Sequence, residues 1–380
     1  IPIHLVSAVP SLETFSNIKN KKYNHTRLTN RYRDFPLPEA KVVNLEKSSL
    51  KKNQFIADET IELIQDYLKN KEQVLFFLNR RGYAPFLICK KCGFKHLCPN
   101  CSIYLTYHKS TNKLICHYCG VKVKKEKNCK TDKELCDFRM YGPGVEKIYD
   151  ELKTIFPKKN IKIFSSDFLA KKNEPESILK KIEKNEIDIL VGTQLISKGF
   201  NFPKLNCIVV VDADFSGMGY DLRTTEKNIQ LYNQLSGRAG RFSSKSTIVY
   251  QTATPLSETL KDVLENNPEK FLNNELIIRK NKNLPPYSRL IALIISANSS
   301  QDSFRAAQEI KKKLITINQL DVLGPVDSPI FKVKKKYRTR LLLRSKNSNL
   351  IQKSVGKILD NLTISKKIKL TVDVDPINFA

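Results

Sequence analysis

The run Val74-Leu-Phe-Phe-Leu78 and the run Ile187-Asp-Ile-Leu-Val191 decide the fold, because apolar residues fill nearly every position of both. Such strands are buried on both faces, which is typical of a parallel sheet covered by helices. Around them, apolar residues recur at helical spacing within 56–68, 145–156 and 222–235. Strands that alternate with helices in this way predict a doubly wound α/β domain.

The expected elements continue through the rest of the chain. Further strands are expected at 1–6, 161–164, 207–211 and 247–252, and a further helix at 178–182. After Pro255 the pattern changes to a β-α-β-β-α-β order, which predicts an α+β domain of the ferredoxin-like type. Its expected elements lie, in chain order, at 290–297, 304–314, 331–333, 339–344, 351–362 and 368–374.

The charge balance points to a polyanionic partner. The 380 residues include 66 Lys and Arg against 38 Asp and Glu, a formal net charge of +28. A compact protein this basic repels itself unless a polyanion is near; nucleic acid is the commonest, and an anionic membrane surface the next. The simplest alternative is a Lys- and Asn-rich surface that is merely solvated. No apolar run approaches the roughly 20 residues that cross a bilayer, and no secretory signal opens the chain, so we expect no membrane partner.

Cysteines are concentrated in one segment, with eight of the nine between residues 89 and 136. Two thiolates separated by two residues face one metal ion from a tight turn, and two such pairs complete a tetrahedral zinc site. Metal binding would supply most of the stability of this segment, which has few apolar residues. The absence of an export signal disfavours a disulfide scaffold, and doubled pairs disfavour an iron–sulfur cluster. The regular pairs are Cys89 and Cys92, Cys98 and Cys101, and Cys116 and Cys119.

The last two cysteines of this segment, Cys129 and Cys136, depart from that spacing. Either a longer loop brings Cys136 to the metal, or Asp132 supplies an oxygen ligand, which zinc accepts. Cys207 stands alone in an apolar run, which indicates a buried core thiol.

A turn rich in Gly and Arg, Gly237-Arg-Ala-Gly-Arg241, follows the helix expected at 222–235. Arg238 and Arg241 can both reach a polyphosphate, because a guanidinium meets phosphate oxygens in two places and keeps its charge. The neighbouring glycines permit close approach. The alternative is a solvated basic turn.

Polar residues also follow the strand expected at 187–191. Gly192 offers a backbone amide and Thr193 a hydroxyl, at the edge where α/β sheets hold their ligands. These groups suit a nucleic-acid phosphate, and an ordinary strand-to-helix turn with a capping threonine is the alternative.

Two further basic clusters have two interpretations each. Arg80 and Arg81 either contact phosphate or lead into the cysteine-rich segment. A basic strip on an expected hairpin either follows a phosphate backbone or supplies solvated lysines that protect an edge strand from aggregation. The residues of this strip are Lys332, Lys334, Lys335, Lys336, Arg338 and Arg340.

Taken in order, these motifs resemble the PriA (primosomal protein N′) family of bacterial replication-restart DNA helicases, in superfamily 2. The resemblance covers nearly the whole chain, and the cysteine array inside the second motor lobe is its most specific part. Its motifs are Ser7-Ala-Val-Pro-Ser-Leu-Glu13, Leu78-Asn-Arg-Arg-Gly-Tyr-Ala-Pro85, the cysteine pairs with Cys116-His-Tyr-Cys-Gly120, Gly142-Pro-Gly144, Val191-Gly-Thr-Gln194, Lys198-Gly199, Gln234 to Arg241, Pro285-Pro-Tyr287, Leu323-Gly-Pro325 and Asp373-Val-Asp-Pro376.

The resemblance implies two RecA-like lobes that close on Mg2+-ATP and pull along single-stranded DNA. Arg238 and Arg241 match the family's arginine-finger motif, which stabilises charge on the γ-phosphate, and Gln234 precedes them in that motif. The family's motif that contacts the DNA backbone corresponds here to Thr193, Gln194 and Lys198.

The resemblance also implies two zinc ions. An outer set would hold one of them: Cys89, Cys92, Cys129 and the irregular Cys136 position. An inner set would hold the other: Cys98, Cys101, Cys116 and Cys119. In the family the zinc module takes part in duplex opening and primosome assembly. The implied partners are forked or single-stranded DNA, primosome proteins and single-strand-binding protein, in the bacterial cytoplasm at the nucleoid.

The implied domain organisation has four parts. Residues 1–50 would end the first RecA-like lobe and form the interlobe connection, and residues 51–88 with 138–254 would form the second lobe. Residues 89–137 would be the zinc-binding insertion, and residues 255–380 a C-terminal domain that binds branched DNA.

Two departures qualify the resemblance. Val9 stands where the family's Ser-Ala-Thr-Pro motif has threonine, and no Gly-x4-Gly-Lys-Ser/Thr or Asp-Glu-x-His box occurs in the chain. Because the chain also begins with Ile rather than Met, we expect a piece of a longer helicase that lacks the Mg2+-ATP cradle and hydrolyses no ATP alone. The alternative is a non-catalytic, zinc-dependent platform for DNA binding and assembly.

Overall fold

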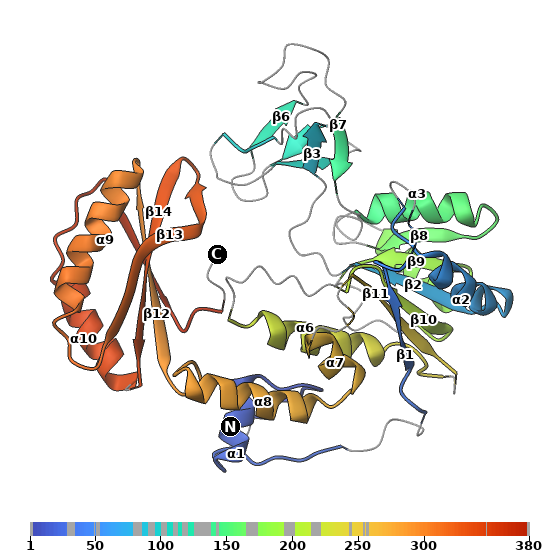
Figure 1. Cartoon of the computed structure of the whole chain (residues 1–380), viewed down its shortest axis with the longest axis horizontal. Helices are drawn as coiled ribbons and strands as arrows, with labels where there is room; N and C mark the ends of the chain where they lie inside the picture. The colour runs from blue at the N-terminus through green and yellow to red at the C-terminus, as the bar shows by residue number, and fades with distance from the viewer. Residues whose placement is uncertain are drawn as a thin grey trace. The chain divides into compact units, whose positions relative to one another are not determined.

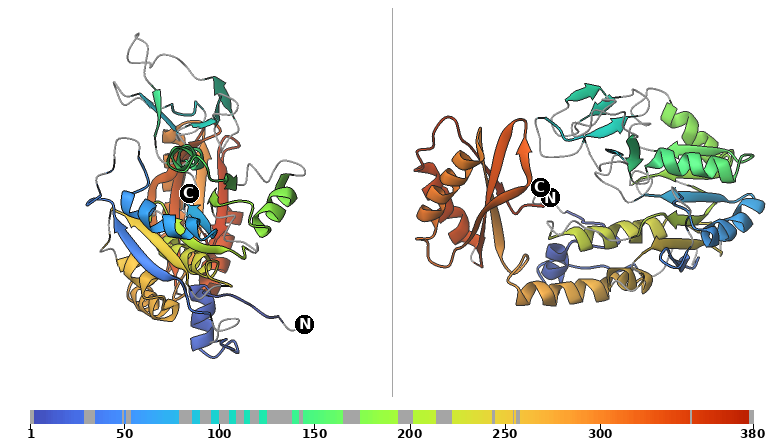
Figure 2. Two further views of the ribbon diagram at one scale, coloured as in Figure 1. Left: turned by 90° about the vertical axis from the view of Figure 1, so that its right-hand side faces the viewer. Right: turned by 45° about the horizontal axis from the view of Figure 1, so that its top comes forward.

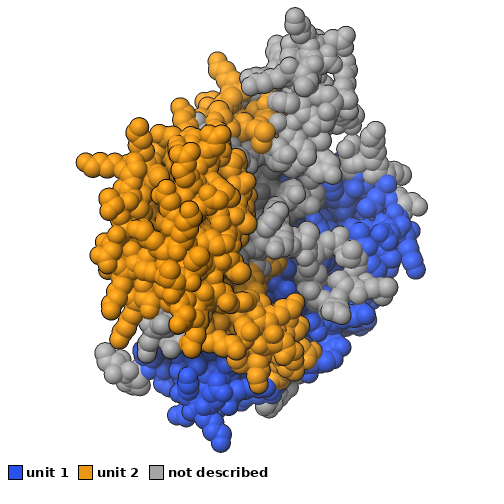
Figure 3. Space-filling view, turned by 60° about the vertical axis from the view of Figure 1, so that its left-hand side comes forward, with its two compact units in different colours: residues 1–83, 143–216, 225–272 blue, residues 84–142, 217–224, 273–380 orange. Residues whose placement is uncertain are grey.

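A computed structural model of the chain divides into two compact units, which Figure 3 shows in different colours. Unit 1 comprises residues 1–83, 143–216 and 225–272, and unit 2 comprises residues 84–142, 217–224 and 273–380. The structure describes residues 3–28, 35–48, 50, 54–78, 86–89, 96–99, 105–108, 113–115, 121–124, 138–141, 144–164, 174–193, 202–213, 222–242, 245–253, 255, 258–346 and 348–377.

Unit 1 is built on a parallel sheet of six strands in the order β1-β11-β10-β2-β9-β8. Every residue of the four central strands is buried. The apolar runs therefore form strands that are covered on both faces, as their sequence predicts. The six strands, in sheet order, are β1 (Glu39–Asn44), β11 (Thr247–Thr252), β10 (Leu205–Val210), β2 (Gln73–Phe77), β9 (Ile189–Gly192) and β8 (Ile161–Phe164).

Helices cover both faces of this sheet (Figure 1). On one face, α2 (Asp58–Lys69) and α3 (Val145–Ile155) pack into a core that includes Phe76. On the other face, α5, α6 and α7 pack into a core that includes Phe77. Neighbouring residues of β2 thus point to opposite cores, as the alternation of side chains along a strand requires. The bounds of these three helices are Glu174–Glu183, Thr224–Ser236 and Glu258–Leu264.

The first fifty residues differ from their sequence prediction. No strand forms among residues 3–6, whereas α1 (Leu12–Lys19) and β1 form within the part that was expected to be a connection. Strand β1 lies at the edge of the sheet and buries only Val43, so its mixed composition carries no apolar run. Helix α1 begins at Ser11, whose side chain accepts a hydrogen bond from the N–H of Thr14 (3.2 Å).

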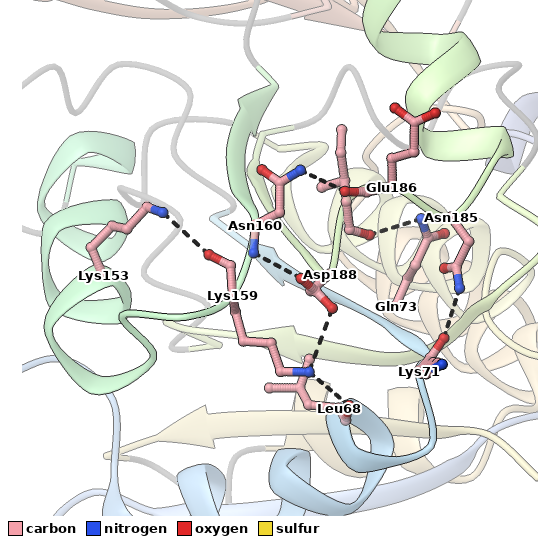
Figure 4. A network of polar contacts seen from close by, with 10 residues as sticks. Leu68, Lys71, Gln73, Lys153, Lys159, Asn160, Asn185, Glu186 and Asp188 are labelled. Atoms are coloured by element: carbon pink, nitrogen blue, oxygen red, sulfur yellow. Dashed lines mark hydrogen bonds and ion pairs between the residues drawn. The ribbon is translucent and has the colours of Figure 1, made fainter.

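Two buried glutamines join the helices of unit 1 to its sheet. Gln73, at the start of β2, donates from Nε2 to the carbonyls of Ile182 (2.9 Å) and Ile187 (3.0 Å), in the polar network of Figure 4. Gln251, in β11, is fully buried; its Oε1 accepts from the N–H of Ala57 (3.0 Å) and the hydroxyl of Thr60 (2.8 Å). Gln251 therefore fixes the N-terminus of α2, where Ala57 provides no side-chain cap.

Unit 2 contains an antiparallel sheet of four strands in the order β13-β14-β12-β15. Helices α9 (Ser300–Leu314) and α10 (Ser348–Asp360) pack on one face of it, as the right-hand view in Figure 2 shows. The β-α-β-β-α-β order and this strand order confirm the expected α+β domain, which follows α8 (Pro268–Asn281). The strands are β12 (Arg289–Ala297), β13 (Asp321–Val333), β14 (Lys336–Ser345) and β15 (Lys369–Val374).

The cysteine-rich segment of unit 2 contains two small antiparallel sheets. Its described core consists of Leu87, Cys98, Leu105 and Leu114. The five strands are β3 (Phe86–Cys89), β4 (Thr106–His108), β5 (Lys113–Ile115), β6 (Lys122–Lys124) and β7 (Phe138–Tyr141). Across both units, none of the described helices has the length and apolar character of a membrane span.

Replacement of Gln251 by Leu should reduce the free energy of unfolding by about 3 kcal/mol, because buried donors and acceptors around it lose their partner. Equilibrium denaturation in urea measures this loss. Gln65→Leu, at an exposed position of α2, is the matched control and should change the value by less than about 0.5 kcal/mol. Equal values for the two variants would contradict the anchoring role of Gln251.

Candidate functional site

The carboxyl ends of the central strands β2, β9 and β10 meet at one edge of the parallel sheet. Backbone hydrogen bonds between these strands continue to their carboxyl ends. The N–H of Leu78 donates to the carbonyl of Gly192 (2.9 Å), and the N–H of Val211 donates to the carbonyl of Phe77 (3.0 Å). Thr193, which is half-buried, follows β9 directly at this edge. The other residues predicted to contact DNA lie outside the described residues: Gln194, Lys198, Arg80 and Arg81.

The arginine turn, residues 237–241, continues from the C-terminal end of α6. The N–H of Arg238 donates to the carbonyl of Leu235 (2.8 Å), and the N–H of Gly240 donates to the carbonyl of Leu205 (3.1 Å), the first residue of β10. Gly240 has a φ of +66°, a conformation that glycine adopts without strain. The backbone therefore anchors this turn to the amino end of a central strand.

Two guanidinium groups and an amide occupy the turn and the helix before it. Arg238 is half-buried, while Arg241 and Gln234 are exposed. Burial lowers the pKa of Arg238, and the nearby charge of Arg241 lowers it further, although an arginine keeps its charge at neutral pH. The Nε of Arg241 donates to the carbonyl of Gly237 (3.1 Å). This concentration of positive charge suits a polyphosphate.

The arginine turn lies toward the amino ends of the parallel strands, and Thr193 lies toward their carboxyl ends. Leu205 pairs with Gln73 at the amino end of β2, whereas Gly192 pairs with Phe77 at its carboxyl end. Four residues of β2 separate these two levels, or about 13 Å at about 3.3 Å per residue. The structure therefore brings the predicted catalytic residues, Gln234, Arg238 and Arg241, together near the amino ends of the strands. The predicted DNA contact Thr193 lies at the carboxyl ends.

The segment 7–13 is bound to α6, a contact that its sequence does not reveal. The carbonyl of Val9 accepts a hydrogen bond from Nε2 of Gln230 (3.3 Å), and the N–H of Leu12 donates to Oε1 of the buried Glu226 (3.4 Å). Glu226 and Gln230 are four residues apart and share one side of α6. This spacing alone identifies no partner more than 200 residues away in the chain.

Arg279 of α8 is a second residue that the sequence analysis missed. Its side chain is 1% exposed and forms an ion pair with Glu275 (2.9 Å). It also donates to the carbonyls of Pro285 (3.1 Å) and Leu222 (2.9 Å). Leu222 precedes α6 by two residues, so Arg279 fixes the segment that leads into the helix of the arginine turn. In the sequence, Arg279 resembles the exposed basic residues around it.

The ladders of the cysteine-rich segment bring distant parts of the cysteine array together. Cys89 pairs with Phe138 in the sheet of β3 and β7, so Cys136 lies two residues along the chain from the partner of Cys89. In the other sheet, Ile115 pairs with Thr106, and the N–H of Leu105 donates to the carbonyl of His96 (2.8 Å). The segment before Cys116 therefore runs beside β4, and the residue before β4 is bonded to the segment that contains Cys98.

Cys98 is the predicted ligand whose side chain the structure describes. It is 5% exposed and, like the buried Cys207, forms no disulfide. A buried thiol that forms no disulfide fits a metal ligand at Cys98, whereas Cys207 lies inside the parallel sheet, where burial raises its pKa and keeps it protonated. For Cys89 the structure describes the backbone alone. The remaining predicted ligands lie outside the described residues: Cys92, Cys101, Cys116, Cys119, Cys129 and Cys136.

The basic strip of the C-terminal domain divides between the two faces of the sheet. The hydroxyl of Thr339 bonds to that of Ser303 in α9 (2.9 Å), so Thr339 faces the helices. Because side chains alternate along β14, Arg338 and Arg340 face away from the helices. Lys332 pairs with Tyr337, on the same side of the strand as Thr339.

Three family models match the chain. Residues 137–243 match "Helicase conserved C-terminal domain", residues 98–123 match "PriA DNA helicase Cys-rich region (CRR) domain", and residues 280–377 match "Primosomal protein N C-terminal domain". The second of these is a zinc-ribbon family, so the cysteine-rich segment is a zinc-binding ribbon. The first contains β8 to β10 and the arginine turn.

Curated proteins named "Replication restart protein PriA" are similar over nearly the whole chain. The protein of Rickettsia conorii is 38% identical over 377 residues, which are 99% of this chain and 58% of the relative. The protein of Borreliella burgdorferi is 34% identical, with 98% and 56% covered, and that of Haemophilus influenzae is 32% identical, with 99% and 52% covered. The chain thus spans somewhat more than half the length of these relatives. With the helicase lobe, the zinc ribbon and the primosomal C-terminal domain in one chain, it belongs to the PriA family of replication restart proteins.

Proposed function

We propose that the protein to which this chain belongs is an ATP-dependent DNA helicase that acts in replication restart, recognises forked DNA and promotes primosome assembly. The observation that carries the proposal is the combination in one chain of a parallel-sheet helicase lobe, a zinc ribbon and the family's C-terminal domain. Its partners would be forked or single-stranded DNA, primosome proteins and single-strand-binding protein, in the bacterial cytoplasm at the nucleoid.

Within this function, Arg238 and Arg241 are proposed to stabilise the charge that develops on the γ-phosphate of Mg2+-ATP. Their proximity and the partial burial of Arg238 support this role, because a desolvated guanidinium interacts more strongly with an anion. Gln234 lies one turn before them and is accessible to the same ligand. The Mg2+-ATP cradle itself is proposed to come from a lobe that precedes these motifs.

DNA contact is proposed at the carboxyl edge of the sheet. Thr193 follows β9 there, and Arg80 and Arg81 come shortly after β2 in the sequence. Gln194 and Lys198 follow Thr193 in the motif that the family uses for the DNA backbone. In this arrangement hydroxyl, amide and cationic groups contact phosphates without reading the bases.

The cysteine-rich ribbon is proposed to hold two zinc ions, one in the outer set and one in the inner set of cysteines. Pairing of Cys89 with Phe138 supports Cys136 as the fourth outer ligand. Two residues of chain reach at most about 7 Å, whereas the six residues from Asp132 can extend to about 20 Å. The ions would supply stability, because zinc–thiolate bonds add to the few apolar contacts of this segment.

The four-part domain division predicted from the sequence remains our proposal for the whole protein, with residues 1–50, 51–88 and 138–254, 89–137, and 255–380 as its parts. The contacts of Val9 and Leu12 with α6 support a link between the N-terminal segment and the second lobe. Such a link would let nucleotide binding in one lobe alter the position of the helix that carries the arginine turn.

Metal analysis with cysteine replacement tests the zinc assignment. The purified protein should contain two zinc ions per chain, and Cys136→Ser should reduce the content to about one because a fourth thiolate is lost. Asp132→Asn is the matched control and should leave the content unchanged. A loss of zinc in Asp132→Asn, but not in Cys136→Ser, would contradict the proposed outer set.

Replacement of Arg238 by Ala in the full-length protein should lower the turnover number for DNA-stimulated ATP hydrolysis by about 10³-fold, as expected when an arginine finger is removed. Binding of forked DNA should persist. Lys261→Ala, at an exposed position of α7, is the control for loss of one positive charge and should retain turnover. Normal turnover in Arg238→Ala, or no ATP hydrolysis by the unaltered full-length protein on any DNA, would contradict the proposed activity.

Joint replacement of Arg338 and Arg340 by Ala should reduce the slope of log affinity for duplex DNA against log salt by about 2, since each phosphate contact contributes about 0.9. Fluorescence anisotropy at several salt concentrations measures the slope. Joint replacement of Lys366 and Lys367, which are exposed, removes the same charge and should leave the slope unchanged. An identical slope in both double variants would contradict a phosphate-binding role for the strip.

A further inference from the structure

The described residues of the zinc ribbon form an apolar core. Four residues are buried in it: Leu87 (1% exposed), Cys98 (5%), Leu105 (2%) and Leu114 (0%). Val121 and Val123 pack against them and are partly buried. Cys98 is thus part of an apolar cluster, and the side chains that pack against this cluster reduce the access of water to its sulfur.

One further side chain packs against this core, and it comes from the C-terminal domain. Val333 is the last residue of β13 and pairs with Lys336, the first residue of β14. The two residues between them, Lys334 and Lys335, have φ values of +48° and +65° and form the tight turn of the hairpin. Val333 is therefore at the tip of the β13–β14 hairpin, more than 200 residues along the chain from the ribbon.

The ribbon and the hairpin belong to the same compact unit. Unit 2 contains residues 84–142 together with residues 273–380. This grouping is consistent with the packing of Val333 on the ribbon core, because contacts between the two segments hold them in one unit.

Aromatic contacts brace the hairpin where it meets the ribbon. The rings of Phe331 and Tyr337 pack edge to face with their centroids 5.2 Å apart. The Nζ of Lys332 lies 4.8 Å from the centroid of Tyr337. Both contacts involve Tyr337, the residue after Lys336, and they limit the motion of the tip.

We infer that Val333 completes the core of the zinc ribbon, so that zinc retention by the ribbon and ordering of the basic hairpin tip stabilise each other. With Val333 in place, water has less access to Cys98 and exchange of the zinc ligand is slower. With zinc bound, the ribbon presents a fixed surface on which the tip rests. The coupling is reciprocal, as linkage requires, and it rests on the zinc binding described under the proposed function.

The inference makes Val333 a positioning residue for the basic strip. The tip carries Lys334 and Lys335, which are exposed, next to Lys332 and Lys336. Loss of zinc would free the tip and reduce its contribution to binding of a phosphate backbone, because mobile lysines lose more entropy when they bind. The ribbon would in this way control the DNA affinity of a domain distant in sequence.

The first test compares the rate at which full-length protein releases zinc to a chromogenic chelator. Val333→Asp places a charge in the ribbon core and should release zinc at least about tenfold faster than the unaltered protein, since the shell around a metal site affects its affinity by 10–100-fold. Val326→Asp, in the same strand at a position 49% exposed, is the matched control and should release zinc at the unaltered rate. Equal rates for all three proteins would overturn the coupling.

The second test needs no substitution and covers the case in which Val333→Asp does not fold. Amide hydrogen exchange is measured before and after zinc removal from the unaltered protein. Exchange at 330–338 should accelerate at least about tenfold, while exchange at 290–296, in β12, should stay constant. Unchanged exchange at the hairpin tip would overturn the coupling alone. Purified protein without zinc would overturn both the zinc assignment and the coupling.

Discussion

Burial of the parallel strands on both faces is the constraint on which the rest of unit 1 depends. Every residue of β2, β9, β10 and β11 is buried, so water can satisfy none of their backbone groups and the neighbouring strands must do so. The polar side chains inside this layer, such as that of Gln251, bond to the backbone of connecting segments. Loops can then emerge only where the strands begin or end. Thr193 therefore lies at the carboxyl ends of the strands, and the arginine turn lies at their amino ends.

The sequence predicted the buried strands because a short run of consecutive apolar residues is compatible with few structures other than a strand covered on both faces. For β11 the predicted and observed bounds, 247–252, coincide. It did not predict β1, in which Val43 is the buried residue, because an edge strand with one covered position has neither an apolar run nor strict alternation. Residues 3–6 show the opposite case, since an apolar segment predicted to be a strand forms none.

For the candidate site, local chemistry could be predicted and tertiary partners could not. The spacing of cysteines and arginines is a local pattern, so it is visible in the sequence. The contact between Val333 and the ribbon core depends on how the chain folds over more than 200 residues, and a single valine among lysines carries no sign of it. Arg279 is similar, because its burial follows from the carbonyls of Pro285 and Leu222 that surround it.

The contact between Val9 and α6 shows what Val9 does at the position where the family has threonine. Val9 uses its backbone carbonyl to accept the hydrogen bond from Gln230, and its side chain is 3% exposed. The carbonyl is available whatever the side chain, so the link to α6 does not require a hydroxyl. Helix α6 is continuous from this contact to the arginine turn, where the N–H of Arg238 donates to the carbonyl of Leu235. The hydrogen bond that joins this segment to the helix before the arginine turn is therefore compatible with valine.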